Sequence, residues 1–401
     1  MRIVHVSDCF LPRLGGIEVQ VADLSRVQCE AGHEVLVVTA TPPHGPDTQQ
    51  PVDASMIHRI VAPMPFELPV HPRARRRLAH LLEEWKPDVV HVHVGAISPF
   101  AWAAADCAVR YELPTVVTVH SIWDAVTLGV YRAFDVVRSW SSWPLVVSTV
   151  SEAAAAPIRR AFAGRAEVRV VANGVETEGW RVPPRTCVAA LGMGRHAGIH
   201  IVAVGRLAPR KQPLVLLRVL RAAQRRLLPR IQMCATVVGD GPARPAMERY
   251  LQLHGMRTWV GLVGRLEQAQ VLEALASADL FLAPAAREAF GLAALEARIA
   301  GVPVIARSGT GVAEFVTSGQ EGLLGRTSDE LVDAVVRLAT DDDLRHRITA
   351  HNHATEPSHC AWPTVVHALE QCYARACALV SRDPSPDNSK SHSSRSRHLT
   401  L

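Results

Sequence analysis

The sequence predicts an α/β protein with two doubly wound parallel sheets, one in each half of the chain. Short apolar strands alternate with helices along most of the 401 residues, and this alternation is typical of parallel sheets covered by helices. Some strands, such as residues 88–94, are apolar almost throughout, as buried parallel strands are. The alternation stops near residues 181–198, where Pro and Gly are frequent, and then begins again. We therefore expect two domains joined by a linker.

The composition excludes several classes of protein. Hydrophobic residues make up 48% and charged residues 20% of the chain, which is typical of a soluble globular protein. The net charge of +5 lies largely in short Arg clusters, without the basic and aromatic pattern of a nucleic-acid-binding protein. The N-terminus lacks the apolar core of a signal peptide, and no apolar run reaches membrane-spanning length. The eight Cys are scattered without a CxxC pair, so we expect a reduced, cytoplasmic protein without a zinc site.

The first loop of the chain carries Gly15 and Gly16, between a strand at residues 3–6 and a helix that begins near Ile17. Glycines at this place let backbone amides approach a ligand closely, and a helix N-terminus favours an anionic group. A flexible turn is the alternative interpretation. The spacing is not GxGxxG, so the dinucleotide-binding fingerprint is absent and an NAD-dependent dehydrogenase is disfavoured.

A strand at residues 35–39 precedes a Pro-rich loop and a helical segment at residues 71–87. Four arginines gather in the first turns of that helix: Arg73, Arg75, Arg76 and Arg77. Such a cluster fits anionic lipid headgroups or a phosphorylated acceptor. A solvated helix face explains it as well, so the pattern leaves both interpretations open.

Two histidines lie at the carboxyl ends of the next two strands, His93 near the end of one and His120 at the end of the other. The carboxyl ends of strands face the ligand crevice in open α/β sheets, which makes His120 a candidate site residue. A structural histidine is the alternative. A strand at residues 145–150, a helix from Ser151 and a strand that leads into the Asn173-Gly174 turn complete the first half.

In the second half, a strand ends at Gly205, and Arg206 and Lys211 lie in the loop before a helix that begins at Pro213. Two cations at the carboxyl end of a strand, with a helix N-terminus behind them, predict a clamp for a diphosphate. Exposed surface charge is the alternative. The following strand repeats the pattern, with a turn at Gly239–Pro242.

Two carboxylates mark the segment 288–304, with Glu288 at a loop edge and Glu296 eight residues on in the following helix. Eight helical residues rise about 12 Å, which suits a ligand of nucleotide-sugar length held at both ends. The amides at the helix start favour an anionic group. These amides belong to Phe290, Gly291 and Leu292. An ordinary amphipathic helix with two solvated carboxylates is the alternative.

The end of the chain carries no chemical motif. Residues 362–382 are amphipathic and predict a helix, and the polar, Ser-rich tail at residues 383–401 predicts disorder. The triplet Asp341–Asp343 precedes a helical segment, so we interpret it as a helix cap rather than a metal site.

Together these motifs resemble the retaining glycosyltransferases of family GT4, which share the GT-B fold of two Rossmann-like domains that face each other across a cleft. The resemblance covers nearly all of residues 1–382, and six motifs occur in order along the two halves. They are Gly15-Gly16, the strand that ends in His120, Asn173-Gly174-Val175, Gly205-Arg206-Leu207 with Lys211, Gly239-Asp240-Gly241-Pro242, and the pair Glu288 and Glu296. Two departures are small: Gln212 stands where Gly is frequent, and Glu176 where Asp is commoner.

The resemblance implies a role for each of these positions. Arg206 and Lys211 would neutralise the donor diphosphate as it leaves. Glu288 would hold hydroxyls of the transferred sugar, Glu296 would bind the ribose hydroxyls, and His120 would contact the sugar or the acceptor. The backbone contacts to the donor would come from Gly15, Gly16, Gly205, Gly239, Phe290, Gly291 and Leu292.

The resemblance also implies the reaction. A hexosyl group would move from a UDP-sugar or GDP-mannose to a hydroxyl of a lipid, glycan or small-molecule acceptor, with retention of configuration. The leaving phosphate would take the acceptor proton, so the family needs no protein nucleophile, and fixed cations replace a metal. We therefore expect a nucleotide-sugar co-substrate, no cofactor, no nucleic-acid partner and, through the Arg cluster, peripheral contact with the inner membrane surface.

The expected domains are an acceptor-binding domain at 1–180, a linker at 181–198, a nucleotide-sugar-binding domain at 199–355 and a helix at 356–382 that returns to the first domain. Catalysis would require the two domains to close. Two other functions stay open. One is a nucleotide-sugar epimerase or hydrolase on the same fold, and the other is an inactive, glycosyltransferase-like binding protein.

Overall fold

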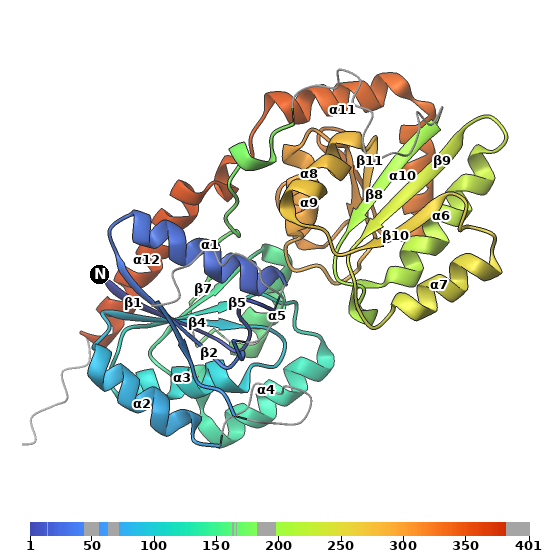
Figure 1. Ribbon diagram of the computed structural model, residues 1–401. Coiled ribbons are helices and arrows are strands. Elements are labelled where there is room, and N and C mark those ends of the chain that lie inside the picture. Colours follow the sequence, from blue (N-terminus) through green and yellow to red (C-terminus); the bar gives the residue numbers. More distant parts are fainter. Residues whose placement is uncertain are drawn as a thin grey trace, which may run out of the picture.

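A computed structural model confirms two parallel sheets covered by helices (Figure 1). It describes residues 1–13, 15–43, 56–62, 72–162, 164–165, 167–182 and 198–381. One sheet with its helices comes from the first half of the chain and the other from the second half. Most of the predicted linker and all of the predicted disordered tail lie outside the described residues.

The first sheet contains seven parallel strands in the order β3-β2-β1-β4-β5-β6-β7. They are β1 (Arg2–Ser7), β2 (Glu34–Thr39), β3 (Ile57–Arg59), β4 (Val89–Val94), β5 (Thr115–Val119), β6 (Val146–Thr149) and β7 (Val168–Val170). The strand order reverses between β1 and β4, so the loops after these strands leave to opposite faces of the sheet. Such a point opens a crevice at the carboxyl ends of the strands.

The second sheet contains six parallel strands in the order β10-β9-β8-β11-β12-β13. They are β8 (Gly198–Val204), β9 (Gln232–Val238), β10 (Val260–Gly264), β11 (Leu280–Ala283), β12 (Val304–Arg307) and β13 (Gly322–Gly325). Here the order reverses between β8 and β11, which places a second crevice at their carboxyl ends. The strand β8 begins at Gly198, the last residue of the predicted linker.

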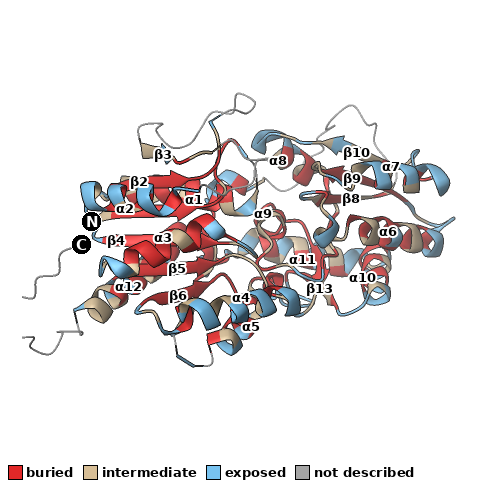
Figure 2. Cartoon of the chain, turned by 90° about the horizontal axis from the view of Figure 1, so that it is seen from below, coloured by how far each residue is buried: buried red, intermediate tan, exposed pale blue. Residues whose placement is uncertain are grey.

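The helices cover both faces of each sheet. Those of the first half are α1 (Gly16–Glu30), α2 (Ala74–Trp85), α3 (Pro99–Arg110), α4 (Ala125–Arg138) and α5 (Glu152–Phe162). Those of the second half are α6 (Pro213–Leu227), α7 (Arg244–Leu253), α8 (Gln268–Ser277), α9 (Leu292–Ile299), α10 (Ser328–Thr340) and α11 (Asp342–Ala354). Figure 2 shows that the strands are buried and that the exposed residues lie on the outer faces of the helices.

The last helix, α12 (Trp362–Val380), lies against β4, β5 and β6 of the first sheet and against α1 (Figure 1). The reason is an apolar stripe at helical spacing, whose members are buried: Trp362, Val365, Val366, Leu369 and Tyr373. The chain thus passes from the first half to the second and back again, and the two passages lie side by side. Val175 donates its backbone N–H to the carbonyl of Cys360 at 2.9 Å.

The Asn173-Gly174 turn is fixed by close contacts at these passages. The side chain of Gln20 on α1 clamps Gly174, since its amide donates to the Gly174 carbonyl at 2.7 Å and its oxygen accepts from the Gly174 N–H at 2.9 Å. The ring of Trp362 packs so closely on Gly174 that any Cβ there would collide with it. The turn therefore requires glycine because of its neighbour.

Two strands and one α-helix were not predicted from the sequence: β3, β13 and α4. The helix α4 is capped by Asp124, whose side chain accepts from the Thr127 N–H. Its valines do not form one buried face, and several are exposed: Val126, Val130, Val136 and Val137. A stripe at helical spacing is present, formed by Thr127, Leu128, Tyr131 and Phe134, but the exposed valines between its members obscured it in the sequence. Among the helices of the described chain, none combines the length and the apolarity that a membrane crossing requires.

Candidate active site

The carboxyl ends of the two sheets face each other. Asp124, in the loop after β5, forms an ion pair with Arg287, in the loop after β11, at 2.7 Å. Ser151, after β6, donates to the carbonyl of Ala289 at 2.5 Å. Ile122 packs against the apolar cluster that contains Phe290. The loop that contains His120 therefore contacts the loop that contains Glu288.

Lys211 and Glu288 come together although they are far apart in the chain. Lys211 ends a short 3-10 helix, Pro209–Lys211, in the loop after β8, and Glu288 lies in the loop after β11. Because β8 and β11 are neighbours at the point where the strand order reverses, their loops share one edge of the sheet. The Lys211 ammonium donates a hydrogen bond to Oε2 of Glu288. Their side chains stay 33% and 18% exposed, so a ligand can reach either partner.

Arg206 is exposed in the loop after β8. Its positive charge acts on the Glu18 carboxyl of the first half. Burial raises the pKa of the Glu18 carboxyl on α1, and the charges of Arg13, Arg206 and Arg210 oppose that rise. Two cations of the second half thus lie near an acid at the start of α1. The Gly15-Gly16 loop and the Arg206 loop face each other, as the resemblance to GT-B enzymes implies.

Glu18 is a residue that sequence reasoning missed. Its side chain is buried, forms an ion pair with Arg13 at 3.6 Å and folds over Gly15, where a Cβ would collide with the carboxylate. Glu18 therefore puts a negative charge at the start of α1, where the sequence predicts an anionic ligand. At Gly16 a Cβ would lie 3.7 Å from a methyl group of Leu292, an ordinary contact, so protein packing does not demand glycine there.

The helix α9 begins as the sequence predicts, directly after the Phe-Gly pair. Gly291 takes the left-handed conformation with φ +97° and forms the N-cap, and no described side chain caps the helix. Phe290 is buried against Phe315. The backbone amides of the first turn are therefore available to a ligand, with the Lys211–Glu288 pair beside them. Gly301, with φ +85°, follows the helix end.

Glu296 lies in α9 and faces α1 of the other half. Burial, and to a smaller extent the charge of Asp23 on α1, raises the pKa of its carboxyl to about 7. The pKa of Asp23 is raised as well, by burial first and in part by Glu176. Two acids from opposite halves thus lie close together without a described basic partner for Glu296. A hydroxyl-bearing ligand would give this carboxylate the donors it lacks.

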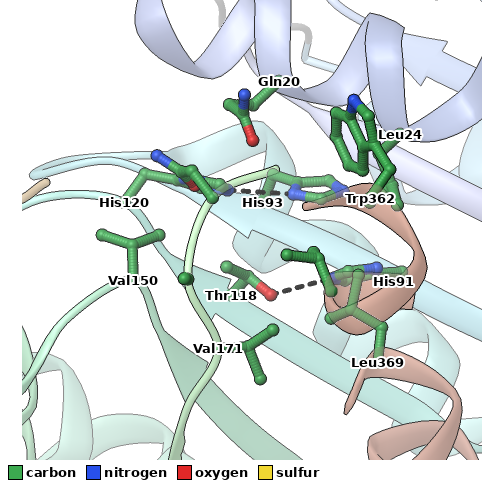
Figure 3. A pocket seen from close by; sticks show the side chains of 13 residues that line it. Gln20, Leu24, His91, His93, Thr118, His120, Val150, Val171, Trp362 and Leu369 are labelled. Atoms are coloured by element: carbon green, nitrogen blue, oxygen red, sulfur yellow. Dashed lines mark hydrogen bonds between the residues drawn. The ribbon is translucent and has the colours of Figure 1, made fainter. Parts of the chain in front are cut away.

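His120 follows β5, and its Nε2 lies 3.0 Å from Nδ1 of His93 on β4. Figure 3 shows this hydrogen bond, beside a small cavity of about 30 Å³ that Gln20, Asn173 and Trp362 also line. A cavity of this volume has room for about one water molecule. Burial lowers the pKa of His120 to about 4, so the imidazole is neutral at physiological pH.

Three buried histidines lie beneath His120. His5, His91 and His93 have ring nitrogens within 4.8 Å of one another, near enough for one metal ion to reach all three. Their nitrogens are instead bonded to one another and to polar neighbours: Gln28, Tyr373, Thr118 and His120. An ion would have to break these bonds. The prediction of a site without metal stays a prediction.

The remaining sequence-predicted residues lie at the same edge. Gly205 directly follows β8. Gly239 follows β9 with φ +125° and lies so close to the Gly205 carbonyl that a Cβ on Gly239 would collide with it. The structure thus gathers the candidate residues of the second half at one edge of its sheet and His120, Gly15 and Gly16 at the facing edge of the other. Their roles stay predictions.

Two family models match the chain, one in each half. The model described as Glycosyltransferase Family 4 matches residues 14–178, and the model described as Glycosyl transferases group 1 matches residues 196–354. Glycogen synthase of Mycobacterium tuberculosis is 30% identical, over 96% of this chain and 97% of that protein. D-inositol 3-phosphate glycosyltransferase of Nocardia farcinica is 28% identical, over 93% of this chain and 88% of that protein.

Solved structures share the arrangement of both halves. Anabaena HepE in complex with UDP-glucose superposes with a TM-score of 0.71 at 18% identity, covering 93% of this chain and 99% of that one. Sucrose-phosphate synthase of Thermosynechococcus elongatus superposes with a TM-score of 0.73 at 18% identity, covering 94% and 99%. The fold and the facing strand ends define a two-domain GT-B glycosyltransferase. The chain belongs to the group 1 glycosyltransferases, family 4, and is a transferase.

Proposed function

We propose that the enzyme transfers a hexosyl group from a nucleotide-diphospho-sugar to a hydroxyl, with retention of configuration and without a metal. The observation that supports this most directly is the meeting of Lys211 and Glu288 beside the uncapped start of α9. A cation, a carboxylate and free backbone amides lie together beyond the carboxyl ends of β8 and β11. This combination suits a diphosphate joined to a sugar.

The ion pair between Lys211 and Glu288 suggests how the donor enters. The ion pair means that each side chain neutralises the other. A diphosphate would attract Lys211 and the nearby Arg206, and Glu288 would then accept hydrogen bonds from the sugar hydroxyls. As the bond to the sugar breaks, negative charge grows on the leaving phosphate, and both cations stabilise it. The leaving phosphate then takes the acceptor proton.

At the other end of the donor, Glu296 would accept hydrogen bonds from the ribose hydroxyls. Glu296 is half-buried, and its carboxyl is repelled by the charge of Asp23, so bonds from two hydroxyls would relieve the repulsion between the acids. Anabaena HepE has been solved with UDP-glucose bound, which supports a nucleotide-sugar donor here. Both UDP-sugars and GDP-mannose remain candidate donors.

The acceptor would bind to the first half, near His120 and the start of α1. We propose a hydroxyl of a lipid, glycan or small molecule. The Arg cluster on α2 supports peripheral contact of a cytoplasmic enzyme with the inner membrane surface, since Arg76 and Arg77 are exposed. Arg75 is partly engaged, because it forms an ion pair with Asp106 at 3.0 Å.

Thermal unfolding with a panel of UDP-, GDP- and ADP-sugars tests the proposal. A donor at a hundred times its dissociation constant should stabilise the folded protein by about 2.7 kcal/mol. Lys211→Ala and Glu288→Gln should abolish this shift and the transfer reaction, whereas Arg337→Ala, which changes an exposed cation on α10, should preserve both. No shift with any nucleotide sugar would refute the proposal. Donor turnover without any acceptor would indicate an epimerase or hydrolase instead.

A further inference from the structure

A chain of hydrogen bonds runs from the interior of the first half to His120. It begins at Gln28 on α1, whose Oε1 lies 2.7 Å from Nε2 of His5 on β1. Nδ1 of His5 lies 2.9 Å from Nε2 of His93, and Nδ1 of His93 lies 3.0 Å from Nε2 of His120. Gln28, His5 and His93 are at most 2% exposed. We call these four residues the imidazole chain.

A second arm fixes the start of the imidazole chain. The amide nitrogen of Gln28 donates to the hydroxyl of Tyr373 at 2.9 Å. That hydroxyl is also 2.9 Å from Nδ1 of His91, and Nε2 of His91 is 2.7 Å from the hydroxyl of Thr118 (Figure 3). Because its nitrogen donates to Tyr373, Gln28 presents its oxygen, which can only accept, to His5.

All three imidazoles of the chain are neutral at physiological pH. Burial lowers the pKa of His5 to about 4 and of His120 to about 4, and it holds the pKa of His93 well below its ordinary value. A neutral imidazole carries one N–H and one lone pair. A ring that donates through one nitrogen must therefore accept through the other. For this reason the position of the proton on the first ring decides its position on each following ring.

The polarity follows step by step. The Gln28 oxygen accepts from His5, so the proton of His5 is on Nε2 and its Nδ1 has the lone pair. His93 must then donate through Nε2 and accept through Nδ1. His120 must likewise donate through Nε2, which leaves a lone pair on its Nδ1. Among the described residues none bonds that nitrogen, and it is not one of the fully buried unpaired atoms, so solvent reaches it.

We propose that Gln28 is a positioning residue that acts through His5 and His93 to hold His120 in one tautomer, with the proton on Nε2 and the lone pair on Nδ1. The catalytic part of this inference rests on the proposed function. The lone pair on Nδ1 accepts a hydrogen bond from a hydroxyl of the sugar or acceptor and so fixes the direction of that hydroxyl proton. Gln28 itself touches neither substrate.

The low basicity of His120 limits what the tautomer can do. A general base works best when its pKa lies near the working pH, and that of His120 is about 4. His120 therefore orients a hydroxyl rather than removing its proton. This leaves the proton for the leaving phosphate, as the proposed mechanism requires. The opposite tautomer would offer an N–H to the hydroxyl and leave the hydroxyl proton undirected.

The test is nitrogen NMR of the full chain labelled with ¹⁵N-histidine, with the His120 signals assigned by their loss in His120→Gln. We expect Nε2 of His120 to be protonated and Nδ1 to show the shift of an unprotonated nitrogen. In Gln28→Leu nothing fixes the direction of the hydrogen bonds along the imidazole chain. A fraction of His120 should therefore carry its proton on Nδ1. In Gln28→Glu a carboxylate accepts from His5 again, so the wild-type tautomer should return. Chelator should leave all spectra unchanged, because the ring nitrogens of the chain bond to one another.

Transfer kinetics provide the second measurement. Gln28→Leu should lower kcat by about tenfold, which is the loss expected when one hydrogen bond is missing in the transition state. The KM for the donor should stay unchanged. Gln28→Glu should restore kcat. Ser25→Ala removes another buried hydrogen bond of α1, to the carbonyl of Val21 at 2.7 Å, and should preserve both kcat and the His120 tautomer.

The outcomes separate this inference from the proposed function. A wild-type His120 that carries its proton on Nδ1 would overturn the inference in the unmodified protein, even if no variant folds. So would a Gln28→Leu variant whose His120 tautomer and kcat match the wild type. If the tautomer is as expected but no nucleotide sugar is turned over, the imidazole chain stands and the proposed function fails.

Discussion

Glu296→Gln should make the folded protein more stable at alkaline pH, although it removes a proposed binding residue. Burial raises the pKa of the carboxyl from 4.5 to about 7. A raised pKa means that the folded state binds the proton more tightly than the unfolded state does. The contribution of the protonated Glu296 carboxyl to the free energy of unfolding is present in full below pH 4.5. It is lost as the pH rises through 7. Above that pH the folded wild type contains a poorly solvated carboxylate, which glutamine replaces without charge.

The magnitude follows from this difference in pKa. At about 1.4 kcal/mol per pKa unit, the ionised carboxylate would destabilise the fold by about 3 kcal/mol. Glu296 keeps intermediate exposure, so we expect a smaller gain for glutamine, on the order of 2 kcal/mol at pH 8. For a domain of 150–250 residues this raises the unfolding temperature by about 4–8 °C.

Calorimetry from pH 5 to pH 8 measures the difference in stability between Glu296→Gln and the wild type. The gain of Glu296→Gln should be largest at pH 8 and fall to about a quarter of that value near pH 5, where the folded carboxyl keeps its proton and the pH lies only just above the unfolded pKa of 4.5. Glu273→Gln changes an exposed carboxylate on α8 and should show no such trend. A Glu296→Gln variant that is no more stable than wild type at pH 8, or equally stabilised at both values, would refute the reasoning.

Three further predictions concern single contacts. Gly174→Ala should destabilise the fold by about 1–3 kcal/mol in thermal unfolding, because the new methyl group meets the Trp362 ring; an unchanged midpoint would contradict this. Glu18→Gln should tighten donor binding a few-fold in calorimetric titration, since it removes an anion near the proposed diphosphate site, and weaker binding would count against that proposal. Arg287 and Asp124 form an exposed ion pair, so a double-mutant cycle should give a coupling below about 1 kcal/mol, and a larger value would show that it locks the two halves.

The candidate residues of the second half could be predicted because their geometry is local. Arg206 and Lys211 lie within one loop after a strand, and Glu288 and Glu296 flank the start of one helix. A parallel sheet gathers such loops at one edge, whatever the order of its strands. What the sequence could not indicate is that Lys211 and Glu288 bond to each other, because this requires β8 and β11 to be neighbours.

The polar interior of the first half was harder to predict for the same reason. His93 was recognised as a histidine near a strand end, but its partner His5 is 88 residues away. The two meet because β1 and β4 are adjacent, and strand order cannot be inferred from alternating strands and helices. The charge interaction between Glu296 and Asp23 depends on how the two halves pack. Glu18 carried no signal, because an acid in a first helical turn is common.

The imidazole chain also changes how the returning helix α12 is understood. Tyr373 lies on α12, and its hydroxyl bonds both Gln28 and His91. The orientation of the Gln28 amide, and with it the proposed tautomer of His120, depends on a side chain near the end of the described chain. An apolar helix would cover the sheet equally well. The hydroxyl at position 373 is needed because Gln28 and His91 are buried and an unpaired polar group there would destabilise the fold. The helix α12 thus supports the histidines near the carboxyl ends of the first sheet's strands through a buried polar contact as well as through packing.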